Sequence, residues 1–171
     1  NAAFTVQVNT SDERVTEQGM DQVEFLISAN VGESSKPLAK IASGGELSRT
    51  VLALKSILTL ENYPKTLVFD EVDAGIGGRV ASTIGEKLAH LGTAHQVFCV
   101  THLPQVASYA SQHFHVTKRP SAERTIVEIV PLEQKARVEE ISRMMAGKAL
   151  TETTRKQARE LLRRGKDFVT S

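Results

Sequence analysis

Two short apolar runs, separated by one amphipathic segment, constrain the fold of this chain more than any other feature. The runs cover residues 66–70 and 95–100, and polar residues bound each of them. Strand, helix and strand in this order predict two parallel strands joined by a crossover helix. Because the runs are continuously apolar, we expect both faces of these strands to be covered. The helical spacing of the segment between them comes from Val80, Ile84, Leu88 and Leu91.

The segments on either side of this unit predict peripheral strands and further helices. Residues 4–8 and 23–27 alternate apolar and polar side chains, which favours two antiparallel strands joined by a polar loop. Residues 30–40 have loop composition, and a helix is expected over 45–61. The fold class is therefore α/β, a mostly parallel sheet with flanking helices and peripheral antiparallel strands. After residue 100 we expect a short helix at 103–110, strands at 114–118 and 125–130 around a turn at 119–124, and helices at 132–145 and 152–164, the last with Thr151 as its N-cap.

Length and composition bound the class of protein. With 171 residues, of which 40% are hydrophobic, the chain is expected to form one domain with a real core. A net charge of +1 gives no strong case for nucleic acid or membrane, and no apolar stretch approaches the length of a membrane span. A single cysteine, Cys99, excludes an internal disulfide and favours a reducing, cytoplasmic compartment. It lies in an apolar run, so we expect it to be buried and inert. The chain starts without a methionine or a signal-peptide pattern, as if taken from the middle of a longer protein.

Ser43-Gly44-Gly45-Glu46 stands where the helix over 45–61 is predicted to begin. One interpretation is a capping box, with Ser43 as N-cap and Glu46 at the third helical position, and it needs no function. The glycines favour a second interpretation, because they disfavour a first helical turn yet let a ligand approach the backbone closely. A helix N-terminus with exposed N–H groups binds anions such as a terminal phosphate. On the residues alone, both interpretations stay open.

Asp70 and Glu71 end the first apolar strand. Ligand sites of parallel sheets lie at the carboxyl ends of strands. One carboxylate there suits Mg²⁺ with water still on the ion, and a second suits the orientation or deprotonation of an attacking water. Neighbouring residues on a strand point to opposite sides, so the two acids share a site only if the chain turns just after Asp70. The glycine-rich segment 73–78 supplies such a turn, and a solvated strand end is the alternative.

Thr101-His102 ends the second apolar strand, in the same layer as the two acids. An imidazole there suits a hydrogen bond to a terminal phosphate or to the attacking water. The other four histidines have no such placement, and no Cys/His pair has the spacing of a zinc site. The pattern therefore indicates nucleotide chemistry, although the sequence has no Gly-x-x-x-x-Gly-Lys-Ser/Thr loop for phosphates.

In this order, the three motifs resemble the C-terminal lobe of an ABC-type ATPase head. Residues 43–46 match the signature motif, 67–71 the Walker B strand and 101–102 the switch histidine. The longer strings 36–49, 69–78 and 101–107 resemble the RecN family of bacterial double-strand-break repair proteins, which are related to SMC proteins. The resemblance covers essentially the whole chain, residues 1–171. It implies that the chain is one lobe of a split head, with the Walker A lobe and a coiled coil outside it.

The resemblance also implies cofactors, partners and site residues. ATP and Mg²⁺ are the expected cofactors, and ATP would join two heads in a homodimer. The expected partners are the N-terminal Walker A lobe of the same protein, the second head and, for the full protein, DNA at the nucleoid, with no membrane. The implied roles are Mg²⁺ binding through water for Asp70, positioning of the attacking water for Glu71, a γ-phosphate contact for His102, and contacts to the ATP of the partner head for Ser43, Gly44, Gly45 and Glu46.

One departure from the family pattern concerns the loop after the Walker B strand. SMC-type heads usually carry Leu-Asp where this chain has Ile76-Gly77, so the acid that communicates across the head dimer is absent at that position. Asp73 is a candidate substitute at the nucleotide site. The glycines of segment 75–78 act either through backbone flexibility or only as a tight turn.

Two further interpretations compete with an ATPase head. The alternative is a non-catalytic lobe for dimerisation or DNA docking, and the isolated chain is expected to be inactive in either case. Arg155, Arg159 and Arg163 share one face of the last predicted helix, but Glu152 and Glu160 dilute this stripe, so a solvated face competes with DNA contact. A transporter subunit is disfavoured, since transporter signatures usually carry Gln after the glycines, where this chain has Glu.

Overall fold

The chain divides into two compact units, residues 1–47 and 48–171, where the sequence predicted one domain. The computed structural model describes residues 3–10, 15–17, 19–28, 32, 34–41, 43–58, 63–120, 124–147 and 149–170. The boundary between the units falls inside the first α-helix, α1 (Gly44–Ile57). Among the described residues, the buried hydrophobic side chains all belong to the second unit, beginning with Leu52. The described hydrophobic core therefore belongs to the second unit.

The first unit contains an antiparallel sheet. β1 (Ala3–Thr10) pairs with β2 (Asp21–Ser28) along its whole length, and β2 pairs with the short β3 (Lys36–Pro37). The predicted pair of antiparallel strands is therefore confirmed. A 3-10 helix, η1 (Leu38–Lys40), follows within the segment predicted as loop. The apolar side chains share one face of the hairpin in the pairs Phe4 with Ile27, Val6 with Phe25 and Val8 with Val23.

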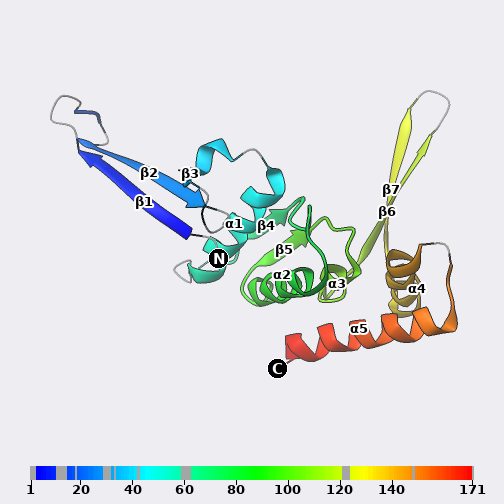
Figure 1. The fold of residues 1–171 in the computed structure, drawn as a ribbon. Helices are drawn as coiled ribbons and strands as arrows, with labels where there is room; N and C mark the ends of the chain where they lie inside the picture. Colours follow the sequence, from blue (N-terminus) through cyan, green and yellow to red (C-terminus); the bar gives the residue numbers. More distant parts are fainter. Residues whose placement is uncertain are drawn as a thin grey trace. The chain divides into compact units, whose positions relative to one another are not determined.

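The second unit is built on the predicted parallel pair. β4 (Thr66–Phe69) and β5 (Gln96–Cys99) run parallel, and α2 (Gly78–Leu91) connects them and lies against one face (Figure 1). The crossover predicted from the apolar spacing is confirmed. The buried residues of this core are Leu52, Phe69, Val72, Ala81, Ile84, Leu88, Leu91 and Val106.

The described residues leave the other face of the β4–β5 pair open. Leu67 and Val97 pack against the core, whereas Val68, Phe98 and Val100 are 69%, 46% and 62% exposed. The prediction that both faces are covered is therefore wrong for this chain taken alone. An apolar run indicates that a strand face is covered, but it does not indicate which part of a protein covers it.

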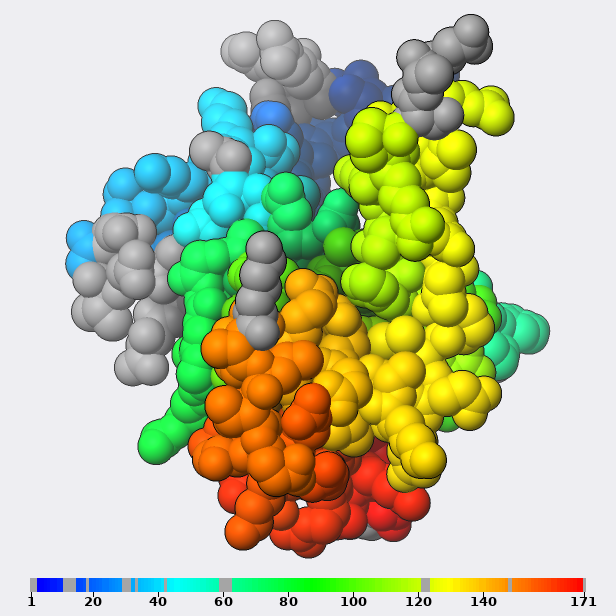
Figure 2. Space-filling model, turned by 90° about the vertical axis from the view of Figure 1, so that its right-hand side faces the viewer, coloured from blue at the N-terminus to red at the C-terminus, as the bar shows by residue number. Residues whose placement is uncertain are grey.

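Helices and a hairpin complete the second unit. After β5 come α3 (Pro104–Ala107), the antiparallel hairpin of β6 (Phe114–Pro120) and β7 (Thr125–Pro131), α4 (Gln134–Ala146) and α5 (Glu152–Thr170). Figure 2 shows the hairpin beside α4. A second small core joins the helices through Ala107, Ile141 and Ala158. No helix among the described residues is both long and apolar enough to cross a membrane.

Three helix ends differ from the prediction by three residues or more, and one of them is that of α3, which ends at Ala107 and not at residue 110. α1 ends at Ile57 and not at residue 61, and residues 59–61 lie outside the described chain. α5 continues to Thr170, beyond the predicted end at residue 164. It continues through Gly165, where an added Cβ would lie 2.3 Å from the carbonyl oxygen of Ser108. The glycine therefore permits close packing of α5 and does not end it. The predicted N-cap is confirmed, because the Thr154 N–H donates to Thr151 Oγ1 at 3.2 Å.

Candidate functional site

The chain turns directly after β4, as a shared site for the two acids requires. Glu71 has φ of +56°, and it is the non-glycine residue with positive φ in the described chain. This backbone region costs an ordinary residue on the order of 1 kcal/mol, and it persists only where the surroundings fix it. The Glu71 N–H donates to Asp70 Oδ1 at 2.9 Å. The predicted turn just after Asp70 is therefore confirmed.

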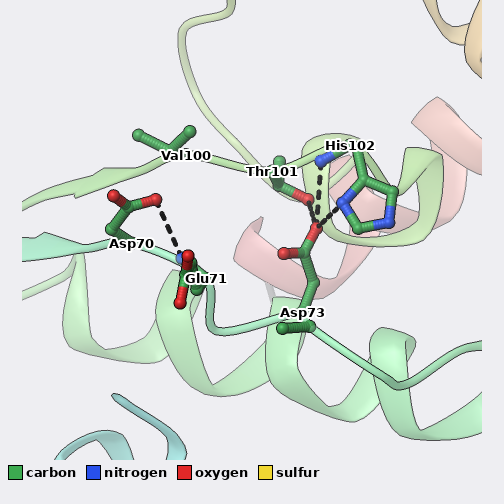
Figure 3. Close-up of a pocket in the computed structure, with 7 residues that line it drawn as sticks. Asp70, Glu71, Asp73, Val100, Thr101 and His102 are labelled. Carbon is green, nitrogen blue, oxygen red and sulfur yellow. Dashed lines mark hydrogen bonds and ion pairs between the residues drawn. The ribbon is translucent and has the colours of Figure 1, made fainter. Parts of the chain in front are cut away.

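A pocket of about 400 Å³ lies where β4 and β5 end (Figure 3). It brings together the two acids that end one strand and the histidine that follows the other. The sequence predicted this meeting from the shared layer of the two strand ends. The residues that line the pocket are Asp70, Glu71, Asp73, Ala74, Val100, Thr101 and His102.

Asp73 is the buried carboxylate of this pocket, with a side chain only 4% exposed. Its Oδ2 accepts hydrogen bonds from Thr101 Oγ1 at 2.6 Å and from the His102 N–H at 2.9 Å, and His102 Nδ1 lies 3.1 Å away. Figure 3 shows these three contacts converging on one oxygen. The carboxylate thus joins the turn after β4 to the end of β5. The role predicted for Asp73 at the nucleotide site and in communication across a head dimer stays a prediction.

Two residues of α1 hold the backbone of the turn. Ser48 Oγ donates to the Asp70 carbonyl oxygen at 2.8 Å. The Arg49 guanidinium donates through Nη1 to the carbonyls of Val72, at 3.3 Å, and Ala74, at 2.9 Å. Sequence reasoning gave neither residue a role. No local spacing marks them, because their partners are backbone carbonyls that lie 22 to 25 residues further along the chain.

Burial controls the chemistry of the thiol next to the pocket. Cys99 packs against the core beneath the strand ends. Burial, and then the negative charges of Asp73 and Asp70, raise the pKa of the Cys99 thiol to about 12. A neutral thiol is a poor nucleophile, so the structure supports the expectation that this cysteine is inert.

The helix start predicted at the glycine pair, at residue 45, is confirmed to within one residue. α1 begins at Gly44, and the Leu47 N–H donates to the Ser43 carbonyl at 3.1 Å. Glu46 is the acidic residue of the first turn, where a carboxylate stabilises the helix dipole. The contacts of these residues with a second head stay a prediction.

The arginine stripe of α5 is engaged by carboxylates. Arg155 lies 2.8 Å from Glu139, and Arg159 lies 3.0 Å from Glu152. Arg163 and Arg164 share Glu160, at 2.9 Å and 3.1 Å. These pairs neutralise the stripe, so the described contacts favour the solvated-face interpretation over a DNA contact.

The chain has relatives among curated proteins. It is 46% identical over 164 residues to DNA repair protein RecN of Bacillus subtilis, and 49% identical over 155 residues to that of Halalkalibacterium halodurans. It is also 47% identical over 167 residues to the RecN of Treponema pallidum. These alignments cover 96%, 91% and 95% of this chain. The chain is a relative of RecN.

The chain spans 28%, 27% and 29% of these RecN proteins, less than a third of each. No family model matches the sequence. A solved structure from work on ATP-driven dimerization and DNA stimulated activation of SMC ATPases aligns with a TM-score of 0.48 at 17% identity, over 85% of this chain and 84% of that one. The evidence for the relation to RecN is therefore the sequence identity to the three RecN proteins.

Proposed function

We propose that this chain is the C-terminal lobe of the ATPase head of a RecN-type DNA repair protein. The observation that carries the proposal is the convergence of Asp70, Glu71 and His102 on one pocket from the ends of two parallel strands. The completed head hydrolyses ATP to ADP and phosphate in the cytoplasm, at the nucleoid. The chain has no lysine-containing phosphate loop, so this activity needs the N-terminal Walker A lobe and a second head.

Asp70 fits the role of a magnesium ligand. Its exposed carboxylate stands at the carboxyl end of β4, and its Oδ1 already accepts the Glu71 N–H. Mg²⁺ usually takes one or two carboxylates, keeps several waters and shares the phosphates of its nucleotide. The described residues contain no cluster of three or more His, Cys, Asp or Glu suited to a metal, and such a cluster is not needed for this mode. When bound, the ion neutralises charge on the transferred phosphoryl group.

Glu71 and His102 act on the water and the terminal phosphate. The left-handed backbone of Glu71 turns the chain directly after β4, and both Glu71 and Asp70 line the same pocket. Glu71 orients the attacking water and accepts its proton, the role of a base placed beside a phosphoryl group. The His102 ring, at the end of β5, contacts the γ-phosphate or the same water. Ser43, Gly44, Gly45 and Glu46 complete the ATP site of the partner head, so ATP joins the heads and hydrolysis releases them.

The Walker A lobe of the same protein covers the open face of the β4–β5 pair. Val68, Phe98 and Val100 make this face apolar, and parallel sheets are covered on both faces in folded proteins. The remaining length of the RecN relatives, more than two thirds, supplies chain for this cover. DNA is a partner of the full protein, and we do not place it on the ion-paired arginines of α5.

The proposal can be tested by measuring ATP hydrolysis and dimerisation of the full-length RecN-type protein that contains this chain. Glu71→Gln should lower ATP hydrolysis at least about 10²-fold, because it removes the base. ATP-dependent dimerisation, followed by light scattering, should persist, since the amide keeps the shape of the side chain. Glu133→Gln is the matched control, because Glu133 is an exposed carboxylate at the start of α4, away from the pocket.

Two results would go against the proposal. Turnover of Glu71→Gln at the wild-type rate would remove Glu71 from its role. A wild-type protein that dimerises without hydrolysing ATP would favour the alternative, a non-catalytic lobe for dimerisation or DNA docking.

A further inference from the structure

We propose that Asp73 is a positioning residue that fixes the orientation and the protonated nitrogen of His102. Through this contact it presents Nε2 of the ring to the nucleotide. The inference rests on the proposed ATPase function, and it replaces the direct nucleotide contact expected for Asp73. Asp73 itself touches neither the nucleotide nor the water in this arrangement.

The geometry holds His102 at two points. Its backbone N–H and its ring Nδ1 both lie within hydrogen-bonding distance of Asp73 Oδ2, at 2.9 Å and 3.1 Å. The His102 side chain is 73% exposed, so packing alone does not define its rotamer. The buried Asp73 carboxylate contacts both the backbone N–H and the ring Nδ1 of His102, so it restricts the rotamer of the ring. The exposed ring is therefore oriented by Asp73.

The same oxygen determines which ring nitrogen carries the proton. An ionised carboxylate oxygen only accepts hydrogen bonds, and Asp73 Oδ2 already receives Thr101 Oγ1 and the His102 N–H. Nδ1 of His102, 3.1 Å from this oxygen, makes a favourable contact with it only as the protonated nitrogen. In the neutral ring, Nε2 then accepts a hydrogen bond from water. In the protonated ring, Nε2 donates one to a phosphate oxygen.

Asp73 is suited to this task because it is itself held in place. Arg49 donates to the carbonyls of Val72 and Ala74, which are the residues directly before and after Asp73. Thr101 Oγ1 donates to the carboxylate and accepts the Leu103 N–H at 3.0 Å. The carboxylate thus has a fixed backbone and a fixed neighbour. Partners of this kind, which orient a functional histidine, typically change activity when they are removed.

A double-mutant cycle in full-length RecN separates positioning from a merely structural role. Asp73→Ala should lower kcat for ATP about 10- to 100-fold, with little change in KM. In a His102→Ala background, the same Asp73→Ala change should cause no further loss, because the residue it acts through is gone. An equal loss in both backgrounds would overturn the proposal.

Asp73→Asn is the conservative variant of the cycle. Its amide oxygen can take the place of Oδ2, since the fixed His102 N–H requires an acceptor there. It should restore most of the kcat that Asp73→Ala loses. No recovery, with a folded protein, would contradict the hydrogen-bonding role.

The tautomer of His102 gives a readout that needs no ATP turnover. In ¹⁵N-histidine-labelled full-length RecN at alkaline pH, with the signal assigned by His102→Gln, the ring should be the Nδ1–H tautomer in the wild type and in Asp73→Asn. Asp73→Ala should give a mixture of tautomers. An Nε2–H ring in the wild type would overturn the proposal, even if Asp73→Ala fails to fold. Absent ATP hydrolysis with the Nδ1–H tautomer intact would instead count against the proposed function alone.

Discussion

The turn after β4 and the helix α5 are both rich in charged side chains, but they use these charges differently. At the turn, Arg49 of α1 donates to two backbone carbonyls, and the buried Asp73 accepts from a hydroxyl and a backbone N–H. In α5, the arginines bond to carboxylates on the surface, as Arg159 does to Glu152. In both regions, the partners of these named groups lie within the described chain.

The difference in partners decides what each region contributes. A charged group that satisfies a partly buried backbone group contributes roughly 1.5–3 kcal/mol, and its loss leaves that group without a partner. An exposed ion pair contributes about 0–1 kcal/mol and is screened by salt. The charges of the turn therefore fix atoms in place, whereas those of α5 keep a surface neutral and solvated. The number of charged residues alone therefore does not distinguish the candidate site at the turn from the solvated surface of α5.

The largest expected effect in this comparison comes from Arg49→Met. The change keeps the aliphatic stem but removes the donors to the Val72 and Ala74 carbonyls. We expect the free energy of unfolding to fall by roughly 2–4 kcal/mol, measured from the urea midpoint at an unchanged m value. Arg159→Met is the matched control on α5 and should change stability by less than about 1 kcal/mol. Equal losses of stability for the two variants would mean that the contacts of Arg49 stabilise the fold no more than an exposed ion pair of α5 does.

A smaller effect is expected from Gly165→Ala, which tests what attaches α5. The new Cβ would meet backbone atoms of Ser108, at 2.3 Å from O and 2.8 Å from C, so the helix must move. Overpacking of this kind costs about 1–3 kcal/mol, against a helix-propensity gain of about 1 kcal/mol. We expect a net loss of stability by thermal unfolding. The exposed neighbour Lys166→Ala should be nearly neutral, and a stabilised Gly165→Ala protein would show that α5 is not held by this close approach.

The sequence predicted the regular parts of the second unit because their signals are local. Apolar runs and helical spacing marked β4, α2 and β5, and the rule that ligand sites lie at the carboxyl ends of parallel strands predicted that Asp70, Glu71 and His102 meet. The role of Arg49 could not be predicted, because it donates to backbone carbonyls. Every residue has a backbone carbonyl, so no residue type in the sequence marks these partners. Asp73 was recognised as a site residue, but its direction depended on the fold of the turn. The exposure of one face of β4 and β5 was not predicted. An apolar run indicates that a strand face is covered, but not whether the covering residues belong to the same chain segment.

The smallest expected effect is a stability term of α5 that depends on pH. Hydrogen bonds from Arg163 and then Arg164 lower the pKa of Glu160 from 4.5 to about 2. A depressed pKa means that the folded state favours the charged carboxylate, so this contribution is present above pH 4.5 and is lost as the pH falls toward 2. The difference in Tm between the wild type and Glu160→Gln should therefore shrink over this window. It should also shrink at about 1 M salt, where the Debye length is about 3 Å.

Arg49→Met at the turn is the comparison for the pH and salt dependence of Glu160→Gln. The acceptors of Arg49 are backbone carbonyls, which do not titrate, so the loss caused by Arg49→Met should persist across the same pH window and in the same salt. A Glu160→Gln difference that survives both acid and salt would mean that the ion pairs of α5 are less exposed to solvent than their positions indicate. In that case, α5 would be a fixed element like the turn, and its arginines would no longer count as a solvated face.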